Sequence, residues 1–289
     1  MESQENQYRW PKAEAVYPDR PGRSYALKRL RYRLRAFSHR GLIAQFEQFI
    51  NQHPFLVKLL NEHADYSYPL VYRFLDKRFN RKQRFQAICD NLRFLPEKLT
   101  ALSTPIYKTP LSFGVVIPDF EMTLSMTTHQ PMEGYWVLEL WHKPRNELVY
   151  LLTFAKLGES LLISVVQGPN FEGSKEMVKQ LTKTCYGLRP AYLMVETMKA
   201  LTKVLGFNQL LGIPQKYQNK SRFIQSSHYV VDYDAIFAES GGQLKDYWEL
   251  PLEIDRNLDD VPSKKRSMYR KRYAMLDDLA KLIEEKLGL

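Results

Sequence analysis

The segment of residues 161–250 constrains the fold of this chain most strongly. It begins with an apolar run, LLISVV at 161–166, which is typical of a buried strand, and two segments with helical spacing follow it. A second apolar run at 209–213 stops at Pro214. Two strands joined through helices usually pair in parallel, and ligand sites often lie where such strands end. We therefore expect a parallel pair with a site at the end of its first strand.

A run of alternating, branched and aromatic residues precedes this unit and indicates antiparallel strands. The predicted strands are 111–117, 120–127, 135–142, 148–154 and 161–166, and turn-forming residues separate them. Upstream, helical spacing predicts helices at 24–37, 42–50, 55–62, 68–79 and 81–95, the last ended by Pro96. We predict an α+β fold, in which an N-terminal helical region precedes a mixed, mostly antiparallel sheet with a helical crossover.

The chain divides into four predicted parts. Residues 1–22 contain three prolines and form an extended arm, and residues 23–105 form the helical region. Residues 106–255 form the mixed α/β domain, with a short helix at 233–239 and a last strand at 247–252. Residues 256–289 form a basic C-terminal helix, at 263–287, that packs on the domain.

Composition excludes several classes of protein. With 289 residues, of which 44% are hydrophobic, the chain is long enough to bury a large core, and it contains no apolar run of membrane-spanning length. The polar N-terminus lacks the apolar segment of a secretory signal, which predicts a cytoplasmic protein and leaves peripheral contact with the inner membrane open. Cys89 and Cys185 are far apart and form no zinc-binding pair, so we expect two buried thiols and no metal.

The formal charge of +10 is unevenly distributed. Cations cluster at 20–40, at 73–84 and at 264–272. Such clusters attract anionic lipid, a lipopolysaccharide precursor or tRNA, although a solvated basic surface explains them equally well. The third group is proposed to bind an anionic surface and consists of Lys264, Lys265, Arg266, Arg270, Lys271 and Arg272.

Three segments resemble the VirK/YbjX family of Gram-negative bacteria. They are the segment 186–190 (YGLRP) with 193–197, the segment 233–242, and the segment 261–273 (VPSKKRSMYRKRY), and the resemblance spans roughly residues 25–285. It implies a role in virulence, envelope remodelling and tolerance of cationic peptides. The loop after Ile213 departs from the family pattern, because its histidine comes late, at His228.

The order of strands and helices is also similar to the N-acetyltransferase-like (GNAT) fold. That resemblance implies two neighbouring strands that part near residue 167 and admit the pantetheine of an acyl-CoA, with Val166, Gln167 and Gly168 at the opening. Two helices stand where that fold has one, and its glycine-rich loop is missing. A glycine turn before a helix can bind an anion, so we expect Gly187, Leu188 and Arg189 to bind the pyrophosphate in place of the missing loop. The alternative is a turn between two helices in which Arg189 forms a structural ion pair.

The remaining candidate residues lie on the strands and loops near this opening. We expect Glu139, His228 and Tyr233 to act as general base or acid, and Trp136, Asn170, Tyr229 and Asp234 to contact substrate. Each also has a plain structural interpretation: a solvent-facing carboxylate, a surface histidine, a turn residue or aromatic packing.

These observations predict a transferase that moves an acyl or aminoacyl group to an amine or hydroxyl acceptor. The expected donors are acyl-CoA or aminoacyl-tRNA, with no tightly bound cofactor, and the acceptor is an envelope component such as lipopolysaccharide. The alternative is a non-enzymatic protein that holds anionic lipid or a lipopolysaccharide precursor at the cytoplasmic face of the membrane. The sequence leaves the oligomeric state open.

Overall fold

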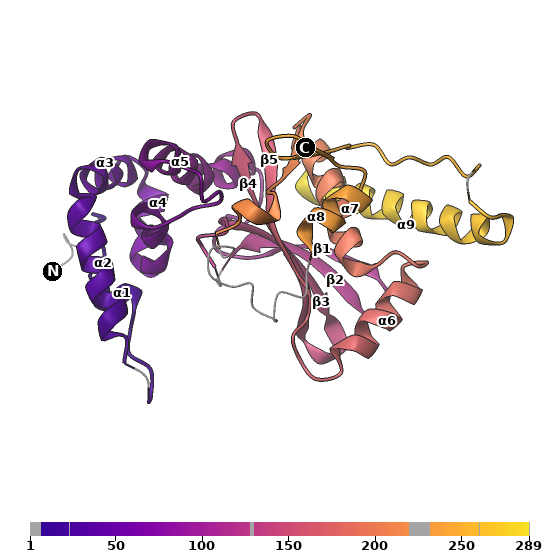
Figure 1. Ribbon diagram of the computed structural model, residues 1–289, viewed down its shortest axis with the longest axis horizontal. Helices are drawn as coiled ribbons and strands as arrows, with labels where there is room; N and C mark the ends of the chain where they lie inside the picture. The colour runs from indigo at the N-terminus through magenta and orange to yellow at the C-terminus, as the bar shows by residue number, and fades with distance from the viewer. Residues whose placement is uncertain (1–6, 23, 128–129, 220–231, 260, 289) are drawn as a thin grey trace.

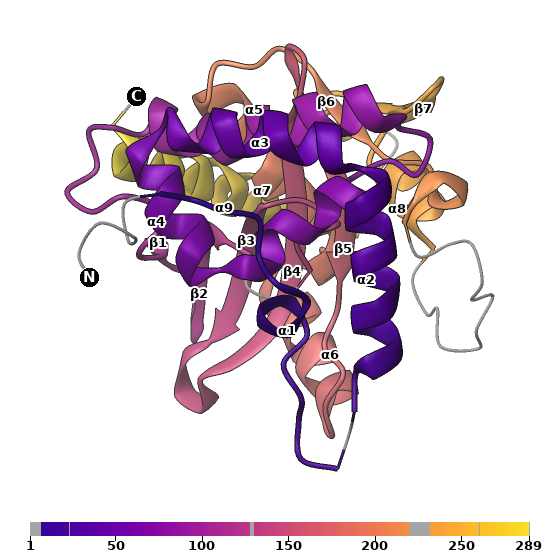
Figure 2. The ribbon, with the colours of Figure 1, turned by 90° about the vertical axis from the view of Figure 1, so that its left-hand side faces the viewer.

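The structure, a computed structural model, describes residues 7–22, 24–127, 130–219, 232–259 and 261–288. A layer of N-terminal helices lies on one side of a central sheet, and further helices from the C-terminal half lie on the other side (Figures 1 and 2). The sheet has eight strands and mixes antiparallel pairs with one parallel pair. The predicted α+β fold class is therefore confirmed.

The N-terminal layer differs from prediction in three places. Its elements are α1 (Ala13–Val16), α2 (Ala26–Ser38), α3 (Arg40–Asn51), α4 (Pro54–Glu62), the 3₁₀ helix η1 (Ala64–Val71) and α5 (Arg81–Lys98). The helix predicted at 68–79 is wrong: η1 ends at Val71, and Leu75 has a left-handed φ of 54°, which an α-helix does not contain. The helix α5 runs through Pro96 to Lys98, and α1 interrupts the predicted extended arm.

The central sheet follows the predicted meander closely. Its strands are β1 (Leu111–Ile117), β2 (Phe120–Met126), β3 (Trp136–His142), β4 (Glu147–Leu157), β5 (Ser160–Gln167), β6 (Leu210–Gly212), β7 (Gln243–Leu244) and β8 (Trp248–Leu250). The order across the sheet is β1-β2-β3-β4-β5-β6-β8-β7, and only β5 and β6 run parallel among the strands described. The two-residue strand β7, which the sequence did not predict, forms the edge.

Two helices make the crossover between β5 and β6, as predicted. They are α6 (Ser174–Thr184) and α7 (Pro190–Val204), and α8 (Tyr233–Glu239) follows β6. The last helix, α9 (Ser263–Leu287), has the predicted bounds and contacts α7 and β1. Its buried residues Leu276, Leu279, Ile283 and Leu287 recur every three or four positions, so they form one apolar face along its C-terminal half.

Polar contacts in the core fix the N-terminal layer to the sheet. The side chain of Asn91 on α5 is fully buried, donates to the carbonyl of Lys156 at 2.8 Å and accepts from its N–H at 2.7 Å. The indole of Trp136 donates to the Asn91 carbonyl at 2.9 Å. Because unpaired polar groups are costly in a core, these contacts fix how α5 sits on β4.

Candidate functional site

The strands β5 and β6 part early along β5. They pair from Leu161 with Leu210 to Ile163 with Gly212, and Ile213 donates one more hydrogen bond to Ile163. The next carbonyl of β5, that of Ser164, accepts a hydrogen bond of 3.1 Å from the Gln218 side chain, which is 4% exposed. Pairing with β6 therefore ends four residues before Gln167, where the opening was predicted, and the Gln218 side chain occupies the first position past the separation.

The loop between η1 and α5 holds Gln218 in place. Asp76 forms an isolated antiparallel bridge with Gln218, and Lys77 N–H donates to the Tyr217 carbonyl at 3.1 Å. The guanidinium of Arg78 pairs with the fully buried Asp76 carboxylate at 2.6 Å and lies 3.8 Å from the centre of the Tyr217 ring. The N-terminal layer thus closes the separation between β5 and β6.

A polar row crosses one face of the sheet beside this separation. In the strand register, Leu151 of β4 is paired with Glu139 of β3 on one side and with Gln167 of β5 on the other. Thr123 of β2 is paired with Glu139 in turn, and Ser112 of β1 with Thr123. Paired residues point to the same face, so these side chains form one row, and Glu139 and Gln167 stand about 10 Å apart across two strand spacings.

Glu139 is the chemically distinctive member of this row. One of its oxygens accepts hydrogen bonds from the hydroxyls of Thr123 at 3.4 Å and Ser125 at 3.3 Å, and from the Trp141 indole at 3.3 Å. Thr123 and Ser125 are buried, and Glu139 is half-buried. Within the described part of the chain, no Lys, Arg or His forms an ion pair with Glu139. A carboxylate held by neutral donors suits a general base or the binding of an amine.

The two halves of the predicted cofactor site do not come together. Gln167 and Gly168 lie just before α6, whereas Gly187 and Arg189 lie beyond its other end, and an 11-residue helix is about 16 Å long. The Arg189 guanidinium pairs with Glu239 at 2.5 Å and lies over the Tyr192 ring. Arg272 of α9 donates to the Tyr186 carbonyl at 2.7 Å and covers Gly187. Leu188 is half-buried in the same turn.

The other predicted residues on β3, β5 and the loop after β5 have varied surroundings. Trp136 and Val166 are both buried, and the register places them on the opposite face to Glu139. Gly168 is exposed at the backbone but lies against Tyr150, whose ring is 3.1 Å from where a Cβ would stand. Asn170 is exposed in the loop between β5 and α6.

The predicted residues near α8 form a structural network. The Asp234 carboxylate accepts from the Gln215 N–H at 3.0 Å and from the Trp248 indole at 2.7 Å. Tyr233 is 4% exposed, and its N–H donates to the Gln215 side chain. These contacts join α8 to β8 and to the start of the segment that carries Gln218. His228 and Tyr229 lie outside the described residues.

The basic cluster of α9 divides into anchored and exposed cations. Arg266 donates to the Val261 and Asp259 carbonyls, and Arg272 lies over the Tyr269 ring. The exposed cations of the cluster are Lys264, Lys265, Arg270 and Lys271.

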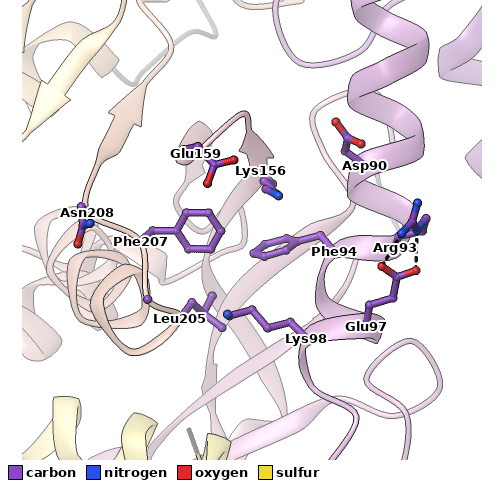
Figure 3. A pocket seen from close by; sticks show the side chains of 11 residues that line it. Asp90, Arg93, Phe94, Glu97, Lys98, Lys156, Glu159, Leu205, Phe207 and Asn208 are labelled. Carbon is purple, nitrogen blue, oxygen red and sulfur yellow. Dashed lines mark hydrogen bonds and ion pairs between the residues drawn. The ribbon is translucent and has the colours of Figure 1, made fainter.

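A separate hollow of about 550 Å³ lies between α5, the turn from β4 to β5, and the loop after α7 (Figure 3). Phe94 and Phe207 meet edge to face across it, and its ion pair joins Arg93 and Glu97 at 2.6 Å. Its Glu159 precedes β5, whereas Gln167 ends that strand. Eight strand residues span about 26 Å, so this hollow is remote from the polar row. The hollow also contains charged side chains outside that ion pair, among them Lys98, Lys156 and Glu159. We place the candidate site at the polar row, because the half-buried Glu139 is held there by three neutral donors.

Two features are absent from the residues that the structure describes. None of their helices combines the length and the hydrophobicity that crossing a membrane requires. They also contain no group of three or more His, Cys, Asp or Glu side chains arranged to hold a metal ion.

Comparison with known proteins assigns the family. Residues 21–285 match the sequence profile described as "Protein of unknown function (DUF535)". The chain belongs to the DUF535 family. The YbjX protein of Escherichia coli is 25% identical over 279 residues, which cover 89% of this chain and 83% of YbjX. The predicted kinship with YbjX is therefore confirmed.

Other relatives are closer in sequence than YbjX. A Haemophilus influenzae protein is 80% identical over 282 residues, which cover 98% of this chain and 97% of that protein. Membrane protein LapB of Mannheimia haemolytica is 64% identical over 216 residues, which cover 75% of this chain and 96% of LapB. Among solved structures, a mutant of the cAMP-binding acyltransferase from Mycobacterium smegmatis aligns with a TM-score of 0.31 and 8% identity, over 78% of this chain and 66% of that one.

Sequence reasoning singled out Glu139 and Gln167 but missed the residues around them. In the sequence, Thr123 and Ser125 are ordinary strand residues. The only signal that could have linked them to Glu139 was the alternation of side chains along the two strands of one hairpin, which can place Thr123 opposite Glu139. Asp76 and Gln218 are 142 positions apart and carry no local motif, so their contact was not predictable.

Proposed function

We propose that this protein transfers an acyl or aminoacyl group from a carrier to an amine or hydroxyl acceptor, with Glu139 as the general base. The observation that carries the proposal is the state of that carboxylate, which accepts three hydrogen bonds from neutral donors and has no cationic partner among the described residues. It shares a row with Gln167, which ends the strand that parts from β6. A carrier that enters at the separation has to run along β5 for about 13 Å, the length of four strand residues, before it reaches Gln167.

The proposed reaction uses one base and one donor. The acceptor N–H or O–H transfers its proton to Glu139, and the acceptor atom bonds to the carbonyl carbon of the donor. The C–S bond of a thioester, or the C–O bond of an ester, then breaks, and the proton passes to the departing sulfur or oxygen. Gln167, whose amide N–H now donates to Glu133 at 3.4 Å, is the candidate donor to the carbonyl oxygen.

The carrier enters beside β5 in this proposal. The strands β5 and β6 stop pairing after Ile163, and Gln218 occupies the position that follows. Because the Gln218 side chain occupies this position, and the bridge from Gln218 to Asp76 holds it there, the carrier has to displace it to reach the polar row. The proposed acceptor is an envelope component, such as a lipopolysaccharide precursor, because the resemblance of the sequence motifs to the VirK/YbjX family implies a role in envelope remodelling.

The test combines donor binding with transfer. Thermal unfolding is measured with a panel of acyl-CoAs and aminoacyl-tRNAs, since a ligand that binds only the folded form raises Tm. With a donor that raises Tm, Glu139→Gln should keep the Tm increase and lose transfer by about 10²-fold or more, because the amide cannot accept the proton. Glu172→Gln, in the exposed loop before α6, is the matched control and should leave both unchanged. A panel with no effect on Tm, or an unimpaired Glu139→Gln variant, contradicts the proposal.

A second candidate function, attachment to an anionic membrane surface, is favoured by α2. Four of its large apolar side chains are unusually exposed: Leu27 (60%), Leu30 (50%), Leu34 (62%) and Phe37 (70%). At about 100° per residue they fall on one stripe opposite the buried Tyr32, and α2 contains no acidic residue. An amphipathic helix with basic flanks is typical of a segment that lies in a membrane interface.

Charge favours lipid over a second copy of the chain. Arg31 and Arg33 lie about 40° beyond the two edges of the stripe, so two copies placed stripe to stripe bring like charges together. Four partly exposed side chains also offer only on the order of a few hundred Å², less than the roughly 800 Å² per partner of a stable interface. The name of the relative LapB, a membrane protein, agrees with this candidate.

Liposome flotation tests the second candidate. The protein should float with vesicles that contain anionic lipid and not with neutral vesicles. Leu30→Ser with Leu34→Ser should abolish flotation, whereas Val115→Ser, at an exposed position on β1, should not. If replacing Lys264, Lys265 and Arg266 by Ala abolishes flotation and the α2 variant does not, α9 is the attachment site and the role given to α2 is wrong.

A further inference from the structure

A second pocket, of about 390 Å³, lies next to the segment that carries Gln218. Tyr217 and Asp76, which flank and bridge Gln218, are both in its wall. Four cationic side chains also line it, three from the loop between η1 and α5 and one from α5 itself: Arg73, Lys77, Arg78 and Arg84. The only carboxylate among its lining residues is that of Asp76, which Arg78 already neutralises.

Arg84 is the unusual member of this wall. Its side chain is buried, at 7% exposure, yet within the described ranges no carboxylate lies close enough to pair with it. Its Nε donates to the Leu70 carbonyl at 2.9 Å, and one terminal nitrogen lies 3.3 Å from Nε2 of His39. A guanidinium has five N–H donors, so three are left without a partner among the residues that the structure describes. A buried cation without an anion is costly, which makes this position favourable for an anionic ligand.

The surroundings of Arg84 add to the positive potential. Burial and the charge of Arg81 lower the pKa of the Arg84 guanidinium. Burial, followed by the charges of Arg81, Arg84 and Arg35, lowers the pKa of His39, although its hydrogen bond to the Arg35 carbonyl acts in the other direction. The pKa values of Arg84 and His39 are thus both lowered, and an anion in the pocket would raise both again.

We propose that this pocket binds the phosphate groups of an adenosine phosphate. The cations supply charge-assisted hydrogen bonds to phosphate oxygens. The half-buried rings of Tyr72 and Tyr217 already lie under the guanidinium groups of Arg35 and Arg78, so the adenosine is inferred from the expected carriers and not from a stacking face. The volume lies within the range of small-ligand sites. The inference deepens the proposed function and rests on it for the role of the ligand, because CoA and the 3′ end of tRNA, the two expected carriers, both contain an adenosine phosphate.

Calorimetric titration of the full chain tests the binding. The probes are 3′,5′-adenosine diphosphate, CoA and uncharged tRNA, and comparing the last two identifies the source of the phosphate. Arg73→Gln should weaken binding about tenfold or more, and Arg73→Lys should recover part of it. Arg73 is half-buried, and among the described residues its guanidinium donates to the Asn219 carbonyl and lies 5.2 Å from the centre of the Tyr72 ring, so this variant should fold even if Arg84→Gln does not. Arg93→Gln, on the outer face of α5, is the control.

Titration of His39 by NMR provides a readout that a purely structural role would not move. An anion bound at Arg84 should raise the pKa of His39, because it offsets the three nearby cations. Failure of all three probes to bind the wild-type protein at millimolar concentration, or equal affinity in Arg73→Gln, overturns the inference. Binding of a probe without any transfer activity supports the pocket and counts against the proposed reaction. Transfer in which Arg73→Gln leaves the KM for the donor unchanged supports the proposed reaction and counts against the pocket.

Discussion

The contact between Asp76 and Arg78 should respond very differently to removal of each partner. The Asp76 carboxylate is fully buried, whereas the Arg78 side chain is 33% exposed. Arg78→Ala leaves a buried charge that has lost its three guanidinium contacts, of 2.6, 3.0 and 3.1 Å. Asp76→Ala leaves a guanidinium that can turn toward water. We therefore expect Arg78→Ala to destabilise the fold more than Asp76→Ala.

The difference in burial between Asp76 and Arg78 also sets the expected losses in the free energy of unfolding. Breaking a buried ion pair costs about 3–5 kcal/mol, and the partial exposure of Arg78 lowers the expectation for Arg78→Ala to about 3 kcal/mol. That figure includes about 1 kcal/mol for the lost contacts with the rings of Tyr217 and Tyr247, at 3.8 and 4.9 Å. Asp76→Ala should cost about 1–2 kcal/mol, because the remaining cation can be hydrated. The double variant should be more stable than the sum of the single changes predicts, by about 1–2 kcal/mol.

Urea unfolding of the wild type, both single variants and the double variant measures these free energies. All four should show the same m value, which keeps the comparison within a two-state description. If Asp76→Ala is as destabilising as Arg78→Ala, or if the two losses simply add, then the buried carboxylate is not the group that decides stability here, and the reasoning fails.

Three further predictions concern the core. Burial raises the pKa of Cys89 and Cys185 to about 12, so both thiols should resist a thiol reagent at pH 8 until the protein is unfolded, and rapid labelling of the native protein would refute this. Their contribution to the free energy of unfolding should be complete below about pH 8.5 and should decline as the pH rises toward 12. Asn91→Ala should lower the free energy of unfolding by about 2–3 kcal/mol in urea titrations, because it removes the hydrogen bonds to the β4 backbone and leaves those groups unpaired; a loss below about 0.5 kcal/mol would contradict it. Gly212→Ala should cost about 1–3 kcal/mol, because the new Cβ would stand 2.7 Å from the fully buried Phe237 ring, and an unchanged Tm would show that the ring can move aside.

Local sequence determined most of the secondary structure of this protein. The bounds of α9 and the meander from β1 to β5 follow from periodicity and from turn residues that act over a few positions. Where prediction failed, a local rule was overridden. Helical spacing at 68–79 gave way to tertiary pairing, because the Leu75 N–H donates to the Met132 carbonyl. Pro96 removes one hydrogen bond from α5, which ends two residues later at Lys98.

The candidate site was only partly predictable for a different reason. The sequence places Glu139 and Gln167 on strands, but a slip of one residue in register would turn either side chain to the other face. Only the paired strands put both beside Leu151, and only the folded chain brings Asp76 to Gln218 and buries Arg84 without a carboxylate. Periodicity is set by neighbouring residues, and the sequence carries it directly. Register, burial and charge compensation depend on segments that are separated along the chain, from 28 positions between Glu139 and Gln167 to 142 between Asp76 and Gln218, so the tertiary structure alone decided them.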